Sequence, residues 1–199
     1  MRSTPGISRS ERTRTALREA ALARFVRDGF AATSIDDIAA DAGVTTRTFY
    51  RYFASKDEVL FADYEARLDW FRRALSVRPR GERLVDSVLA AVDSFPDDPA
   101  VVTEVARIRS GEMDAARLEP HIRRVESELA REITAHLLSR SDVGDDATEQ
   151  VRATVVGRAV AAAVFTALDM WMAEPSGGLD ELAHLTLLAL QVVEPITGD

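Results

Sequence analysis

With 199 residues, 46% of them hydrophobic and 29% charged, the chain can bury one core of ordinary domain size, or a small domain joined to a larger one. Its net charge of −8, from 25 basic and 33 acidic residues, argues against a non-specific nucleic-acid coat protein and a basic membrane-surface binder. The absence of cysteine excludes disulfides, thiolate metal sites and cysteine nucleophiles.

No segment has the pattern of a targeting signal or of a membrane span. Residues 1–6 lack the apolar stretch of a signal peptide. The longest runs without Asp, Glu, Lys or Arg, at 159–168 and 183–193, have about ten residues, whereas a bilayer needs roughly 20. We therefore expect a cytoplasmic protein that does not enter a membrane.

Apolar residues recur at helical spacing along the whole chain, and glycine and proline fall between the apolar stretches. The first helix carries Leu17, Ala21 and Phe25 on one face and ends near Gly29. Further helices are predicted at about 35–42, 46–53, 56–75, 82–95, 99–109, 120–139, 146–173 and 179–193. The predicted fold class is all-α, with about nine helices.

The helix starts have local signals. Ser55 and Glu58 form a capping box, in which each end satisfies a free N–H of the other. Pro99 and Pro120 each follow an acidic residue and suit a first helical turn, so both are predicted to open helices. The acidic pairs at 97–98 and 145–146 are interpreted as helix N-caps and not as catalytic pairs.

The segment between Phe30 and Leu60 carries the strongest functional signal. Its first helix presents small or apolar residues that let a second helix approach closely, at Ile38, Ala39 and Ala42. Gly43 permits a tight turn at positive φ, Val44 can fill the space between the helices, and Thr45 can cap the next helix. This is the pattern of a helix-turn-helix, with a support helix, a short turn and a recognition helix.

The recognition helix combines hydroxyls, guanidinium groups and an aromatic ring at Thr46, Arg47, Tyr50 and Arg51. An arginine can bind guanine O6 and N7 with two hydrogen bonds, and Thr or Tyr can reach a phosphate or a thymine methyl. Phe49 and Phe53 are expected to face inward. The alternative is a short amphipathic helix that merely carries polar residues, which the combination of side chains disfavours.

This segment resembles the DNA-binding domain of TetR-family transcriptional regulators. The family pattern is matched at Thr33, Ile38-Ala39, Ala42-Gly43-Val44-Thr45, Thr48, Tyr50, Phe53, Lys56 and Leu60. Residues 20–30 resemble the family's first helix, so the resemblance covers about residues 17–60. Arg47 departs from the pattern, because many members have glycine or another small residue at this position.

The resemblance implies a set of DNA contacts. Positions that read base edges or thymine methyls match Thr46, Arg47 and Tyr50. Positions that contact phosphates match Thr33, Thr48, Arg51, Tyr52 and Lys56, and Thr45 completes the predicted DNA-binding set. The predicted domains are a DNA-binding domain at 1–54 and a helical effector-binding and dimerisation domain at 55–199.

The predicted helices Ala147–Ala173 and Leu179–Val193 are apolar nearly all round, so each must be buried on all sides. We infer a homodimer in which these helices pack against their copies, as the resemblance also implies; the alternative is a purely intramolecular core. A two-fold dimer would place two recognition helices in successive major grooves about 34 Å apart, on a near-palindromic operator.

The family resemblance also implies a pocket for a small-molecule effector among the helices after residue 82. Candidate lining residues are Trp70, Phe71, Phe95, Met113, His121, Phe165 and Trp171, and the alternative for each is ordinary core or surface. The three histidines lie far apart in sequence and have no partner at metal-ligand spacing, so we expect neither a metal nor another cofactor.

The sequence therefore predicts a ligand-responsive, DNA-binding repressor that works as a homodimer. One alternative is a transcriptional activator or a DNA-binding module controlled by a protein partner. Another is an all-α enzyme, but no nucleophile elbow, phosphate loop or metal spacing occurs, so we expect a protein that is not an enzyme. The distribution of charge agrees with DNA binding by one end of the molecule. Residues 1–27 contain seven arginines and two glutamates, whereas residues 61–199 contain 15 basic and 25 acidic residues.

Overall fold

The computed structural model describes residues 8–96, 99–111, 115–140, 146–173 and 178–197. Within these ranges it has nine α-helices and no β-strand, which confirms the predicted all-α fold. The helices are α1 (Arg9–Asp28), α2 (Ile35–Asp41), α3 (Thr46–Tyr52), α4 (Lys56–Ser76), α5 (Leu84–Asp93), α6 (Pro99–Gly111), α7 (Ala115–Arg140), α8 (Ala147–Ala173) and α9 (Gly178–Thr197).

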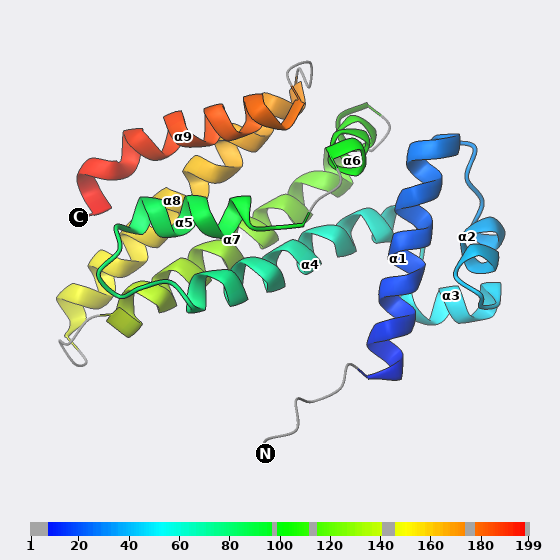
Figure 1. Ribbon diagram of the computed structural model, residues 1–199, viewed down its shortest axis with the longest axis horizontal. Coiled ribbons are helices and arrows are strands. Elements are labelled where there is room, and N and C mark those ends of the chain that lie inside the picture. Colours follow the sequence, from blue (N-terminus) through cyan, green and yellow to red (C-terminus); the bar gives the residue numbers. More distant parts are fainter. Residues whose placement is uncertain (1–7, 97–98, 112–114, 141–145, 174–177, 198–199) are drawn as a thin grey trace.

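The helices form two groups at opposite ends of an elongated molecule (Figure 1). The first three helices gather at one end, and α5, α7, α8 and α9 form a bundle at the other. Helix α4 begins beside α1 and runs into the bundle, where it packs against α5 and α7. It is therefore the continuous element that connects the two groups.

Each group has its own hydrophobic core. The N-terminal cluster contains fully buried residues of the first four helices, among them Leu17, Phe25, Ile38, Phe49 and Leu60. It also contains Val105 and Ile108, which belong to α6. Residues of α4 and α6 thus complete the core of the small N-terminal group, so a movement of either helix would change the packing of that core.

Most predicted helix boundaries are confirmed, and the caps of two helices show further detail. Helix α1 begins at Arg9, well before the apolar face, because Ser8 and Glu11 form a reciprocal capping box. At α4, the Ser55 hydroxyl accepts the Glu58 N–H as predicted, but the Glu58 carboxylate accepts the N–H of Ala54 and not that of Ser55.

The prediction that Pro120 opens a helix is wrong. Helix α7 begins at Ala115 and contains Pro120 in its second turn, where the proline removes one backbone donor from the helix. The last helix is longer than predicted and continues through Pro195 to Thr197. Of the acidic pairs, Asp146 accepts the N–H of Thr148 at 3.0 Å and caps α8, whereas Asp97, Asp98 and Asp145 lie outside the described residues.

Helix α8 is long and apolar enough to cross a membrane by length and composition, which the count of uncharged runs did not reveal. It packs between α7 and α9, and ten of its residues are buried there. The approach to α7 is close because a Cβ on Gly157 would lie 2.3 Å from Thr134 Oγ1 and 2.8 Å from the Ala130 carbonyl oxygen. This is the packing of a core helix.

Candidate nucleic-acid interface and effector pocket

The turn between α2 and α3 has the geometry that the sequence predicted. Gly43 has φ of +67°, a conformation that side chains with a Cβ rarely adopt. The N–H of Val44 returns to the Ala39 carbonyl at 2.9 Å, and the Thr45 hydroxyl caps α3 by accepting the Thr48 N–H at 3.2 Å. The turn and the cap together fix the angle at which α3 leaves α2.

The inner face of α3 is anchored in the N-terminal cluster. Phe49 and Phe53 are 0% and 1% exposed, as predicted, and their ring centroids lie 5.6 Å apart. Ile38 and Ala39 of the support helix are buried against the same cluster. Because its inner face is packed in this way, α3 can present its outer face without changing its orientation.

The outer face of α3 is polar and accessible. Arg47, Tyr50 and Arg51 are exposed, and Tyr50 retains 56% of its accessible surface although it is aromatic. Thr46 and Thr48 are half-buried at the start of the helix. The Thr46 hydroxyl donates to Asp36 of α2, a contact that the sequence reasoning missed. The side chains predicted to read bases therefore share one surface.

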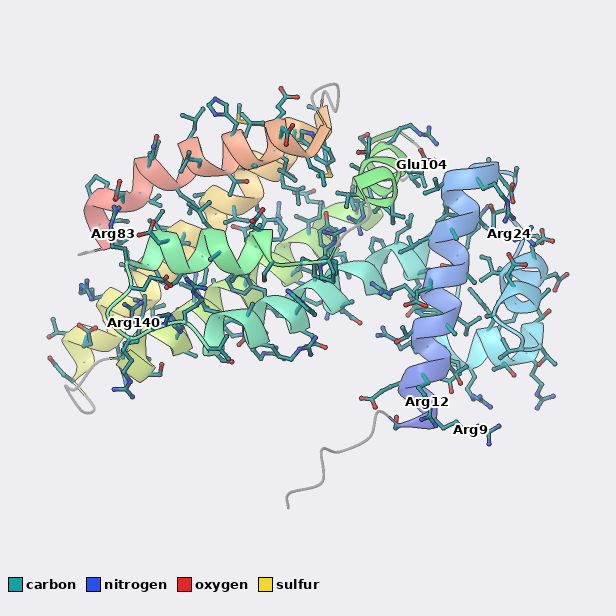
Figure 2. The ribbon with its side chains drawn as sticks, viewed as in Figure 1. Arg9, Arg12, Arg24, Arg83, Glu104 and Arg140 are labelled. Atoms are coloured by element: carbon teal, nitrogen blue, oxygen red, sulfur yellow. The ribbon has the colours of Figure 1, made fainter. Side chains whose placement is uncertain are left out.

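Tyr52 lies where α3 meets the first turns of α1. Hydrogen bonds from Ser10 and from Arg51 lower the pKa of the Tyr52 phenol, and the Arg51 guanidinium carbon lies 5.0 Å from the Tyr52 ring centroid. Arg9 and Arg12 extend from this same end of α1, away from the body of the molecule (Figure 2). The exposed basic groups of α1 and α3 are thus neighbours at one end of the protein.

Other arginines of α1 are engaged with carboxylates. Arg24 forms a two-pronged ion pair with Asp41 of α2, at 2.6 and 2.9 Å, and this pairing lowers the pKa of Asp41. Arg14 pairs with Glu65 of α4 at 2.6 Å. Some of the arginines that make the N-terminal segment basic therefore hold α1 against α2 and α4 through ion pairs.

Two predicted phosphate contacts have other partners in the structure. The Thr33 side chain is 3% exposed and donates to the Gly29 carbonyl at 2.8 Å. The Lys56 ammonium donates to the carbonyls of Phe30 at 2.6 Å and Thr33 at 3.0 Å, and it lies 4.4 Å from the Phe30 ring centroid. Lys56 therefore holds the turn before α2 against the first turn of α4, and its contact with phosphate stays a prediction.

A cavity lies among α4 to α9, beyond the end of the N-terminal cluster. It encloses about 970 Å³ of space not occupied by atoms, part of it open to solvent, and its lining is mainly apolar. Five predicted effector residues line it, namely Trp70, Phe71, Phe95, Phe165 and Trp171. Met113 lies outside the described residues.

His121 is not part of this lining. Its ring stacks on Phe61 with a centroid distance of 4.1 Å, and burial together with the nearby charge of Arg124 lowers its pKa. The lining also contains Tyr64 and Arg109, which the sequence reasoning missed. A signal existed for Arg109, because it is an arginine beside the apolar residues Val105 and Ile108 of α6.

The cavity reaches the N-terminal group through Arg109. This side chain is 5% exposed, its guanidinium donates to the Leu60 carbonyl of α4, and its central carbon lies 3.7 Å from the Tyr64 ring centroid. Leu60 itself is part of the N-terminal cluster. No group of three or more metal-ligating side chains occurs among the described residues.

A buried support helix, a glycine turn and an anchored helix with an exposed basic and aromatic face define a helix-turn-helix DNA-binding regulator. Residues 17–62 match the sequence model of the bacterial regulatory proteins of the tetR family. The chain therefore carries an N-terminal domain of the TetR type.

Similarity to individual proteins extends beyond this domain. The chain is 34% identical over 112 residues to the HTH-type transcriptional regulator TcmR of Streptomyces glaucescens, which covers 55% of this chain and 46% of TcmR. The match thus spans less than half of that relative. SmeT, the repressor of the Stenotrophomonas maltophilia multidrug efflux pump SmeDEF, aligns over 92% of this chain and 90% of its own, with 24% identity and a TM-score of 0.54.

The TetR-family repressor FadR of Thermus thermophilus, solved with lauroyl-CoA, aligns over 90% of this chain and 92% of its own. Its identity is 19% and its TM-score 0.56. At this level of identity, SmeT and FadR establish a common fold over about nine-tenths of the chain and nothing about the ligand.

Proposed function

We propose that this protein is a homodimeric transcriptional repressor that binds a near-palindromic operator and is released from it by a small molecule. The observation that carries this proposal is the outer face of α3, where Arg47, Tyr50 and Arg51 are exposed above the buried Phe49. Guanidinium groups and hydroxyls on a rigid helix are suited to base edges and phosphates in a major groove. Arg47 and Tyr50, with Thr46, would read bases, and Arg51, Thr48 and Tyr52 would contact phosphates.

The dimer is supported by apolar side chains that the single chain leaves uncovered on α8 and α9. They occupy one stripe on each helix, at Val151, Val155 and Met170 on α8 and at Leu187, Leu188, Val192 and Ile196 on α9. Val192 is 80% exposed, and the contact of its apolar side chain with water is unfavourable in free energy unless a partner covers it. A second copy with the same stripes is the self-complementary partner that two-fold symmetry supplies.

Release by a small molecule is supported by the apolar cavity and by its connection to α4 and α6. SmeT has been solved with triclosan and FadR with lauroyl-CoA, so proteins of this fold accept small molecules. We propose that an effector in the cavity moves α4, which would change the separation of the two α3 helices in the dimer. The cavity favours this route over control by a protein partner.

We place the domain boundary near residue 54, where Ser55 caps α4. The N-terminal domain would be the DNA-binding unit and the remainder the effector-binding and dimerisation unit. The protein would act in the cytoplasm, where its operator lies.

Selection of bound sequences from a random duplex library tests the proposal. We expect a near-palindromic consensus, bound by two chains, and loss of discrimination at one base pair per half-site in Arg47→Ala. Arg123→Ala, which removes the same charge from the exposed surface of α7, is the matched control and should keep the wild-type consensus. Enrichment of no consensus by the wild-type protein would reject the proposed function.

A further inference from the structure

The cavity among α4 to α9 has a lining rich in aromatic side chains. Six aromatic side chains contribute to it, namely Tyr64, Trp70, Phe71, Phe95, Phe165 and Trp171. Aromatic faces prefer offset-stacked or edge-on contacts with another ring. The lining is therefore suited to a flat, apolar molecular body.

Two buried donors in this lining have no hydrogen-bond partner within the described part of the chain. They are the Tyr64 hydroxyl and the Trp171 indole N–H, on side chains that are 5% and 1% exposed. A buried donor without an acceptor costs about 1–3 kcal/mol, so native structures keep few of them. Both donors contribute to one cavity from different helices, which indicates that a ligand acceptor completes them.

Two other polar groups of the same lining have partners. The Trp70 indole N–H donates to the Ser94 hydroxyl at 3.1 Å, and the Thr186 hydroxyl donates to the Leu182 carbonyl at 2.7 Å. Unmatched donors are therefore not a general property of this lining.

The charged side chains in the described part of this lining are arginines. Arg67 and Arg109 contribute to it, and no aspartate or glutamate does so among the described residues. The Arg109 guanidinium lies over the Tyr64 ring, so its positive charge is close to the Tyr64 side chain. In a mostly apolar surrounding of low dielectric, a guanidinium attracts an anionic ligand group.

We propose that the effector is a flat, apolar molecule bearing a carboxylate, which accepts hydrogen bonds from Tyr64 and Trp171 and is attracted by Arg109. The inference rests on the proposed function for the identification of the cavity as the effector site. It adds the class of ligand, which neither the fold nor the relatives specify.

Arg109 gives such a ligand a direct route to α4. Its guanidinium donates to the Leu60 carbonyl, and Leu60 is fully buried in the N-terminal cluster. A carboxylate that draws the guanidinium toward the cavity competes with this hydrogen bond. Binding would then loosen the contact between α6 and α4 next to the DNA-binding helices.

Calorimetric titration of the full-length protein with three matched probes tests the inference: 2-naphthoate, 2-naphthamide and 2-naphthylmethylammonium. They share a flat body and differ in having an anionic acceptor, a neutral acceptor or a cationic donor. We expect naphthoate to bind about tenfold more tightly than the amide and at least 100-fold more tightly than the ammonium. Equal binding of all three, tighter binding of the ammonium, or binding of none would overturn the inference.

Conservative variants assign the donors. Tyr64→Phe and Trp171→Phe should each weaken naphthoate binding about tenfold, whereas the control Tyr52→Phe, which removes a hydroxyl outside the cavity, should change it less than threefold. Tyr64→Phe should also unfold at the same or a higher urea concentration than the wild type, because it removes a buried donor without an acceptor. Unchanged naphthoate affinity in Tyr64→Phe and Trp171→Phe would overturn the assignment.

Operator binding in the absence of probe separates this inference from the proposed function. We expect Tyr64→Phe to retain wild-type affinity for the selected operator, because its hydroxyl lies in the cavity and not on the surface of α3. Selective DNA binding without any preference for naphthoate would refute only the ligand class. Preference for naphthoate without selective DNA binding would refute the proposed function and leave the chemistry of the cavity standing.

Discussion

Replacement of Lys56 by methionine separates two roles that the sequence and the structure assign to the same side chain. The resemblance to the TetR family implies that Lys56 contacts a phosphate. In the structure its ammonium donates to the carbonyls of Phe30 and Thr33 and reaches that of Ala31 at 3.5 Å. Methionine keeps the unbranched stem of the side chain and removes only the charge and the donors.

The structure sets the expected magnitude. The two shorter contacts, at 2.6 and 3.0 Å, are hydrogen bonds from a charged donor, and such bonds contribute about 1.5–3 kcal/mol each. The ring of Phe30, 4.4 Å from the ammonium, adds about 0.5–1 kcal/mol. Water can reach the half-buried site and replace part of this, so we expect Lys56→Met to lower the free energy of unfolding by about 2 kcal/mol.

Urea denaturation and the salt dependence of operator affinity distinguish the two roles. Each phosphate contact contributes about 0.9 to the slope of log K against log salt concentration. If Lys56 positions the turn before α2, Lys56→Met loses stability and operator affinity while this slope stays unchanged. If it contacts a phosphate, the slope falls by about 0.9 for each chain and stability changes little.

Arg51→Met is the matched control, because Arg51 is exposed on α3. It should reduce the slope and leave the free energy of unfolding nearly unchanged. A stable Lys56→Met protein with a reduced slope would refute the positioning role, and with it the reasoning from the three carbonyl contacts.

Three further predictions concern the helical bundle. Gly157→Ala should lower the free energy of unfolding in urea by about 1–2 kcal/mol although alanine favours helices, because its Cβ would lie 2.3 Å from a hydroxyl oxygen of α7. The control Gly111→Ala should be neutral or stabilising, because no atom lies within 4 Å of the added Cβ. Equal effects of the two changes would contradict the close packing of α8 on α7. Leu188→Arg and Ala162→Asp should convert the dimer to monomers in sedimentation experiments, and a stable dimer in both variants would place the interface elsewhere. Burial holds the pKa of His121 below 6.5, so the unfolded chain takes up the proton first as the pH falls. The free energy of unfolding should therefore decline below about pH 6.5, and this decline should be weaker in His121→Gln. Identical pH profiles of the two proteins would contradict this role of His121.

The helix-turn-helix could be predicted almost completely from the sequence because its determinants are local. Gly43 and Thr45 fix the turn and the cap within a few residues, and Phe49 and Phe53 separate the inner face of α3 from the outer one. The roles of Thr33 and Lys56 were not accessible in this way. They depend on where the turn after α1 meets the start of α4, a contact between residues more than 20 positions apart.

The differences between predicted and observed helix boundaries, by contrast, have local causes in the sequence. Pro120 follows Glu119 and has the appearance of a first turn, but the residues before it already form α7. The start of α1 at Arg9 was predictable from Ser8 and Glu11, which have the spacing of a capping box. The apolar pattern alone marked only the buried face and the end of this helix, because it reports burial and not helix formation.

The effector cavity was only partly predictable, since large aromatic residues are expected both in cores and in ligand sites. Trp70 and Phe95 do line the cavity, whereas His121 packs on Phe61 outside it. Tyr64 occupies an ordinary apolar position of α4, between Leu60 and Leu68. Its unmatched hydroxyl becomes visible only once α6, α8 and α9 enclose it.

The central claim is that the outer face of α3 recognises a specific DNA sequence. The most direct test is the affinity of the wild-type protein and of Arg47→Ala for the selected operator and for a scrambled duplex of equal length and composition, at one salt concentration. We predict that the wild type prefers the operator at least about 10³-fold, and that Arg47→Ala loses much of this preference while binding the scrambled duplex nearly as before. Equal affinity of the wild-type protein for both duplexes would contradict the account.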